Sequence, residues 1–120
     1  MTTLSDILAA KQAELEPHFK PGFLQRHHTV FQFHFEREEP FYLIVLRDSF
    51  ELVAGVTTAP TISLFFDNHA TCWGLIEGSF DGMRAFMEGR YRADGNIVLS
   101  QLLLYLFKSN DPTNIYEVQD

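Results

Sequence analysis

One segment in the first half of the chain alternates between apolar and polar residues with a period of two. Over residues 29–36, three phenylalanines fall on one face of an extended strand, and Gln32, His34 and Glu36 fall on the other. This pattern predicts a strand with one face in the protein interior and one face in solvent. Residues 41–47 are apolar on both faces, which favours a central strand. Two more strands are predicted over residues 50–56 and 61–66.

Helical periodicity and capping residues mark the rest of the chain. Thr3 and Asp6 have the spacing of a capping box, and Pro17 ends the helix that they begin. Asn68 is the expected cap of a second helix. A third, short helix is predicted before Gly89, a residue type that commonly ends helices. The remaining elements are a short strand over residues 90–93 and a last helix over residues 97–107.

The last predicted helix is apolar around most of its circumference. A helix of this composition is either buried on several sides, or one of its faces meets a lipid-like ligand, a membrane or another chain. The segment 97–107 is shorter than the roughly twenty residues that span a bilayer. Stable membrane insertion is therefore not expected.

The composition favours a single domain over residues 1–120. With 46% hydrophobic residues, a chain of this length buries about two thirds of its unfolded surface, which is enough for one core. Twelve phenylalanines make that core bulky and aromatic. Large rings that do not all interdigitate leave a ligand cavity, although a filled core is the simpler interpretation of composition alone.

The charge balance argues against nucleic acid or an anionic membrane as the main partner. The formal net charge is -7, with 9 Lys and Arg residues against 16 Asp and Glu residues, and binding to phosphates needs a basic surface. Arg84, Arg90 and Arg92 form a local exception, most simply interpreted as solvated charges at an edge. Cys72 is the only cysteine and no signal-peptide pattern is visible, so a cytoplasmic location is expected.

No group of residues has the spacing of a catalytic or metal site. His27 and His28 are adjacent and lack the further Cys and His residues of a zinc site, so no metal or cofactor is expected. Cys72 follows His69 by three residues, but a lone cysteine on an apolar helical face is more often a packing residue than a nucleophile. The sequence therefore predicts a protein that is not an enzyme.

Several segments, taken in order, resemble a known family. They are a strand at 59–64, a helix end at 75–78, Ala-Phe-Met-Glu-Gly at 85–89, the basic strand Arg-Tyr-Arg at 90–92, the Gly-Asn turn at 95–96 and a leucine-rich helix at 102–107. This ordered combination resembles the sterol carrier protein type 2 family, also called nonspecific lipid-transfer domains. The resemblance covers residues 29–109. The first 28 residues depart from it, and residues 71–74 stand where an acidic-aromatic pair is more usual.

The resemblance implies an α+β fold, in which helices pack on one face of a five-stranded, mainly antiparallel sheet with an apolar cavity between them. It also implies noncatalytic binding or transfer of a lipid, such as a fatty acyl, sterol-like or isoprenoid molecule. The facing of the residues and the resemblance together indicate a cavity wall. Its expected members are Phe33, Phe35, Phe65, Trp73, Ile76, Phe86, Leu103 and Phe107.

A second hypothesis gives the last helix a different role. In it, the chain is an accessory module that presents lipid intermediates to biosynthetic enzymes, and the C-terminal helix docks onto a partner enzyme or a second copy of the chain. Lipid retained through purification would favour the carrier. A stable complex that buries the last helix, with an empty pocket, would favour the accessory module.

Overall fold

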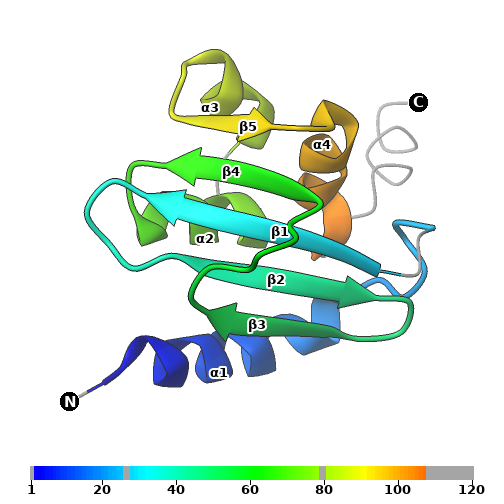
Figure 1. Ribbon diagram of the computed structural model, residues 1–120. Coiled ribbons are helices and arrows are strands. Elements are labelled where there is room, and N and C mark those ends of the chain that lie inside the picture. Colours follow the sequence, from blue (N-terminus) through cyan, green and yellow to red (C-terminus); the bar gives the residue numbers. More distant parts are fainter. Residues whose placement is uncertain (1, 26–27, 79–80, 108–120) are drawn as a thin grey trace.

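The computed structural model describes residues 2–25, 28–78 and 81–107 (Figure 1). Its helices are α1 (Leu4–Leu15), the 3-10 helix η1 (Glu16–His18), α2 (His69–Glu77), α3 (Gly82–Met87) and α4 (Ile97–Leu106). Its strands are β1 (His28–Phe35), β2 (Phe41–Leu46), β3 (Phe50–Ala54), β4 (Ile62–Phe66) and β5 (Tyr91–Asp94).

The helix boundaries lie at the capping residues that the sequence indicates. The Thr3 hydroxyl accepts a hydrogen bond from the Asp6 amide, and the Asp6 carboxylate accepts one from the Thr3 amide, both at 3.2 Å. Asn68 caps α2 by accepting from the amide of Thr71 at 2.9 Å. Gly89 follows α3 with a φ of +75°, a left-handed conformation that glycine adopts without strain. These caps confirm the predicted starts of α1 and α2 and the predicted end of α3.

The strands form one sheet in the order β3-β2-β1-β4-β5. Among the described strands, β1 pairs in parallel with β4, and the other three pairs are antiparallel. The predicted α+β fold with a five-stranded, mainly antiparallel sheet is therefore confirmed. The strand predicted as central over residues 41–47 is β2, which lies inside the sheet between β3 and β1, although β1 is the middle strand. Apolar residues on both faces show that a strand is covered on both sides, but they do not give its place in the order.

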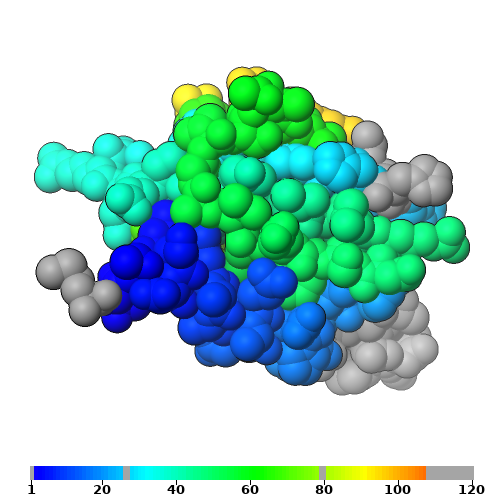
Figure 2. Space-filling view, turned by 60° about the horizontal axis from the view of Figure 1, so that its bottom comes forward, coloured from blue at the N-terminus to red at the C-terminus, as the bar shows by residue number. Residues whose placement is uncertain are grey.

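The helices lie on one face of the sheet. Figure 1 shows α2 and α4 behind the strands and α1 below β3. Figure 2, seen from below, shows the surface of α1 in blue against the β3 edge in green. The Gln12 side chain closes this edge, since its amide donates to the Phe50 carbonyl and accepts from the Leu52 amide, both at 3.1 Å. The open backbone of an edge strand is thereby partly paired.

The connection between β3 and β4 covers part of the opposite face of the sheet. Figure 1 shows the connection from β3 to β4 crossing in front of β2 and β1. Gln32 of β1 points to this face and is 0% exposed, so the predicted solvent-facing side of this strand is wrong at this residue. Its amide oxygen accepts from the Thr57 amide at 2.8 Å, and its amide nitrogen donates to the carbonyl oxygens of Phe41 and Gly55 at 3.1 and 3.2 Å. The glutamine therefore ties the crossing loop to the sheet.

The core lies between the sheet and the helices. Buried apolar side chains from α1, all five strands, α2, α3 and α4 form one cluster there. The last helix contributes Leu99, Leu103, Leu104 and Leu106, while Ile97 and Val98 in its first turn are 45% and 56% exposed. Burial on several sides thus explains most of its apolar residues. No helix in the described part of the chain has both the length and the apolar character to cross a membrane.

Candidate functional site

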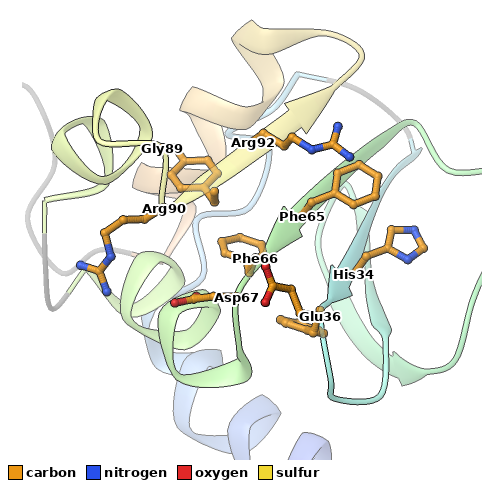
Figure 3. Close-up of a pocket in the computed structure, with 10 residues that line it drawn as sticks. His34, Glu36, Phe65, Phe66, Asp67, Gly89, Arg90 and Arg92 are labelled. Atoms are coloured by element: carbon orange, nitrogen blue, oxygen red, sulfur yellow. The ribbon is translucent and has the colours of Figure 1, made fainter.

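A pocket of about 460 Å³ opens where β1 and β4 end and β5 begins (Figure 3). Its volume lies within the range of small-molecule sites, roughly 300–1,000 Å³. The strand ends supply most of its lining, and the turn between α3 and β5 supplies the rest. The lining residues are His34, Phe35, Glu36, Phe65, Phe66, Asp67, Gly89, Arg90, Tyr91 and Arg92.

The sheet register places two different kinds of side chain around this pocket. Phe35 pairs with Phe66, and Phe66 pairs with Tyr91, so these three rings lie side by side on the helix-facing side of the sheet. The neighbouring row of paired residues across the same three strands consists of His34, Phe65 and Arg92. Because successive side chains of a strand point to opposite faces, that row lies on the face away from the helices. The pocket therefore lies at the end of the sheet, where both faces reach it.

The outer row is a stack of three flat groups from three neighbouring strands. The His34 and Phe65 rings stack with centroids 4.9 Å apart and planes inclined by 14°. The Arg92 guanidinium lies over the Phe65 ring, with its central carbon 4.0 Å from the ring centroid. Figure 3 shows Arg92, Phe65 and His34 in this order along one side of the pocket. A cation–π contact of this kind holds the charge of an exposed arginine in a defined place.

The inner side of the pocket has an aromatic floor that continues into the core. Phe66 contacts Tyr91 and Phe35, with ring centroids 5.3 and 5.9 Å apart. Phe66 also contacts Phe33, and Tyr91 contacts Phe86, with centroid distances of 6.0 and 5.5 Å. Phe66 and Tyr91 are each 4% exposed. Contacts between rings thus run from the floor of the pocket to Phe33 and Phe86 in the apolar interior.

Charges of both signs surround the mouth of the pocket. Arg92 makes no ion pair with a carboxylate among the residues that the structure describes. Asp67 accepts the amide hydrogen of Asn68 at 2.9 Å, and Glu36 is exposed just after β1. Burial raises the pKa of the Tyr91 hydroxyl, so this residue is a neutral phenol at pH 7. The rim can therefore offer an arginine to an anionic group, next to an uncharged aromatic floor.

The structure brings together most of the residues predicted for the cavity wall. Five of them lie in the core between sheet and helices with exposed fractions of 0–8%: Phe33, Trp73, Ile76, Leu103 and Phe107. Phe35 is partly buried and lines the pocket, and Phe86 is partly buried against Tyr91. Phe65 is the exception, because it lies on the face of the sheet opposite to the helices. It lines the pocket at the strand ends but cannot share an interior wall with Phe33.

A second, smaller pocket lies near the far ends of α1 and α2. It has a volume of about 270 Å³ and is lined by Glu14, Leu15, His18, Glu77 and Phe107. Lys11 pairs with Glu77 at 2.7 Å and so links α1 to α2 beside it. The carboxylates of Glu14 and Glu77 disfavour an anionic ligand in this pocket. Within the described residues, no three His, Cys, Asp or Glu side chains form a group that could hold a metal ion.

Of the residues that line the larger pocket, only Phe35 and Phe65 are predicted site residues; those that the prediction missed include His34, Tyr91 and Arg92. The basic strand at 90–92 is visible in the sequence, but local pattern alone favours a solvated edge for its charges. Only the register between β4 and β5 places Arg92 on Phe65. Pairing between segments almost thirty residues apart is not encoded in a local pattern, so sequence alone did not give this contact.

The sequence matches no protein-family model, and it matches no curated protein. Among solved structures, a protein described as the ubiquinone synthesis protein UbiJ-SCP2 aligns with a TM-score of 0.68 at 11% identity, over 88% of this chain and 92% of that one. Sterol carrier protein 2 of Aedes aegypti, in complex with the C16 fatty acid palmitate, aligns with a TM-score of 0.58 at 21% identity, over 87% and 94% of the two chains. The chain has the sterol carrier protein 2 fold.

The sterol carrier protein 2 fold also matches one part of a larger enzyme. The sec-alkylsulfatase Pisa1 from Pseudomonas sp. aligns with a TM-score of 0.68 at 14% identity. The alignment covers 85% of this chain but 16% of the sulfatase chain. The likeness therefore concerns the fold of that segment, and the chain described here spans a small part of the enzyme.

Proposed function

We propose that this chain is a noncatalytic lipid-binding domain that holds the tail of a single-chain lipid between the sheet and helices α2 and α4. The polar end of the lipid lies at the strand-end pocket. The observation that carries the proposal is the aromatic floor, because its ring contacts lead from a polar-rimmed pocket to a Phe-rich interior. The palmitate complex of a sterol carrier protein 2 with the same fold supports the choice of ligand.

The energetics require the tail, rather than the polar end, to supply most of the affinity. Burial contributes about 0.8 kcal/mol per methylene group, so a sixteen-carbon chain gains roughly 11 kcal/mol. Hydrogen bonds to a charged headgroup add only about 1.5–3 kcal/mol each, and association costs about 4–15 kcal/mol. A lipid that stayed in the surface pocket would therefore bind weakly, and the proposal places its tail in the interior.

Phe35 and Phe86 are the side chains that we expect to move when the tail enters. Both are partly buried, whereas Phe33, Ile76 and Leu103 behind them are 0% exposed. Phe86 comes from α3, a six-residue helix that contributes only Gly82 and Ala85 to the buried set. Displacing these two rings opens the floor of the pocket toward the predicted wall residues. The apolar cavity between sheet and helices remains part of this proposal.

A noncatalytic role agrees with the surroundings of the one cysteine. Cys72 is 0% exposed, and burial raises the pKa of its thiol well above the usual value. A cysteine in this state is a thiol rather than a nucleophilic thiolate. The cytoplasmic location expected from the sequence stays a prediction.

The accessory role remains the second candidate, and one observation favours it. Ile97 and Val98 are half-exposed apolar residues in the first turn of α4, the helix that the hypothesis assigns to docking. A solved structure of the same fold is described as a ubiquinone synthesis protein. The rest of α4 faces the core, so a partner enzyme or a second copy would contact only its first turn.

Titration with a fluorescent sixteen-carbon fatty acid tests the carrier function. We expect a saturable signal with one site per chain, and we expect unlabelled palmitate to displace the probe competitively. A signal that rises linearly without saturation, as with a detergent on an apolar surface, would contradict a defined site.

A further inference from the structure

The stacked arginine at the strand-end pocket has no acidic partner among the described residues. We infer that Arg92 binds the anionic group of the lipid, a carboxylate or a phosphate, so that the protein prefers anionic single-chain lipids to neutral or cationic ones. This inference rests on the proposed function, because it specifies the headgroup for the same site. It concerns the pocket lined by the outer row His34, Phe65 and Arg92 and by the strand ends beside it.

The stack fixes the guanidinium while leaving its hydrogen-bond donors available. The central carbon of the guanidinium lies over the Phe65 ring, 4.0 Å from its centroid, and the His34 ring stacks on Phe65 with centroids 4.9 Å apart. A guanidinium presents its five N–H donors at its edges and binds carboxylates and phosphates through two parallel hydrogen bonds. A cation placed in advance loses less conformational entropy on binding than a free side chain. Arg92 is thus suited to bind an anion rather than only to solvate the edge.

The carboxylates on the same rim do not cancel this preference. Asp67 already accepts a hydrogen bond from the Asn68 amide at 2.9 Å, which uses part of its acceptor capacity. Glu36 is exposed at the end of β1 and has no ion pair within the described part of the chain. Its charge is not held by a stacking contact. Glu36 therefore weakens anion binding through space, and its neutralisation should strengthen that binding.

The test compares two sixteen-carbon probes that differ only in their polar end, palmitate and hexadecanol. Binding is measured by isothermal titration at about pH 9, where the fatty acid carboxyl is ionised. Arg92→Gln should weaken palmitate binding at least tenfold, as expected for losing a charge-assisted hydrogen-bond pair, and leave hexadecanol within about twofold. Glu36→Gln should strengthen palmitate binding severalfold and also leave hexadecanol unchanged, because its effect is electrostatic.

Arg84→Gln is the matched control. Arg84 is an exposed arginine on α3 that pairs with Glu88 at 3.1 Å and does not line the pocket. Its loss should leave both affinities unchanged. Arg92→Lys keeps the charge but not the planar fork, and we expect it to recover part of the palmitate affinity. Hexadecyl phosphate in place of palmitate shows which anionic group is bound more tightly.

The possible results separate the inference from the function on which it rests. If wild-type protein binds neither palmitate nor hexadecanol, the proposed function itself is contradicted. If wild-type protein binds both, and Arg92→Gln weakens both equally or neither, lipid binding stands and the role of Arg92 is overturned. Tighter binding of hexadecylammonium than of palmitate would likewise overturn it, by assigning the headgroup to the carboxylates.

Discussion

Gln32→Leu is expected to lower the free energy of unfolding by about 3 kcal/mol, the largest stability effect that we predict for a residue outside the apolar core. Leucine fits the volume but removes the buried hydrogen bond to the Phe41 carbonyl and the partly buried ones to the Gly55 carbonyl and the Thr57 amide. Each buried polar group left unpaired costs about 1–3 kcal/mol. Urea denaturation followed by circular dichroism measures the change.

Gln101→Leu is the control for this substitution. Gln101 lies in α4 and is exposed, so the same chemical change there should stay within about 0.5 kcal/mol, as most surface substitutions do. An equally small loss for Gln32→Leu would contradict the role of Gln32 in holding the crossing loop to the sheet.

Leu103→Trp is expected to reduce palmitate affinity by more than tenfold. Leu103 is 0% exposed, lies on α4 and belongs to the core cluster that the proposed tail occupies. An indole ring would take the space that the lipid needs. Because the lipid-free core holds this leucine tightly, we also expect a loss of about 1–3 kcal/mol in stability, typical of overpacking. Fluorescent fatty-acid displacement and urea denaturation measure the two effects.

Leu8→Trp separates blocked binding from general damage. Leu8 is 2% exposed on α1, a helix that packs along β3 and supplies none of the predicted wall residues. The Leu8→Trp substitution should lower the free energy of unfolding by a similar amount, and the variant should still bind palmitate. Leu103→Phe adds less volume and serves if the tryptophan variant does not fold. Full affinity in a folded Leu103→Trp or Leu103→Phe protein would place the tail elsewhere.

The sequence predicted the elements of this fold well because their signals are local. The capping box at Thr3 and Asp6, the cap at Asn68 and the glycine at residue 89 each act within one helical turn. The alternation in β1 correctly separated the face with Phe31 and Phe33 from the face with Gln32. It could not show that a later loop covers the second face, because that contact joins Gln32 to Thr57 across the sheet.

The site was harder to predict from the sequence, because it depends on contacts between segments that are far apart along the chain. Alternation within β4 puts Phe65 on the face opposite to Leu64 and Phe66, so its assignment to the interior wall gave too much weight to its apolar character. The stack of Arg92 on Phe65 depends on the β4–β5 register, which no local pattern fixes. Sequence therefore indicated the interior rings but not the polar end of the pocket.

The central claim is that a lipid tail lies between the sheet and the helices, and nuclear Overhauser effects between bound lipid and protein test it most directly. The experiment uses unlabelled palmitate and isotope-labelled protein. We predict contacts from the lipid methylenes along the tail to Phe33 and Leu103. The methylenes next to the carboxylate should contact residues of the strand-end pocket. Saturable binding with contacts only to surface residues, and none to Phe33 or Leu103, would contradict the claim.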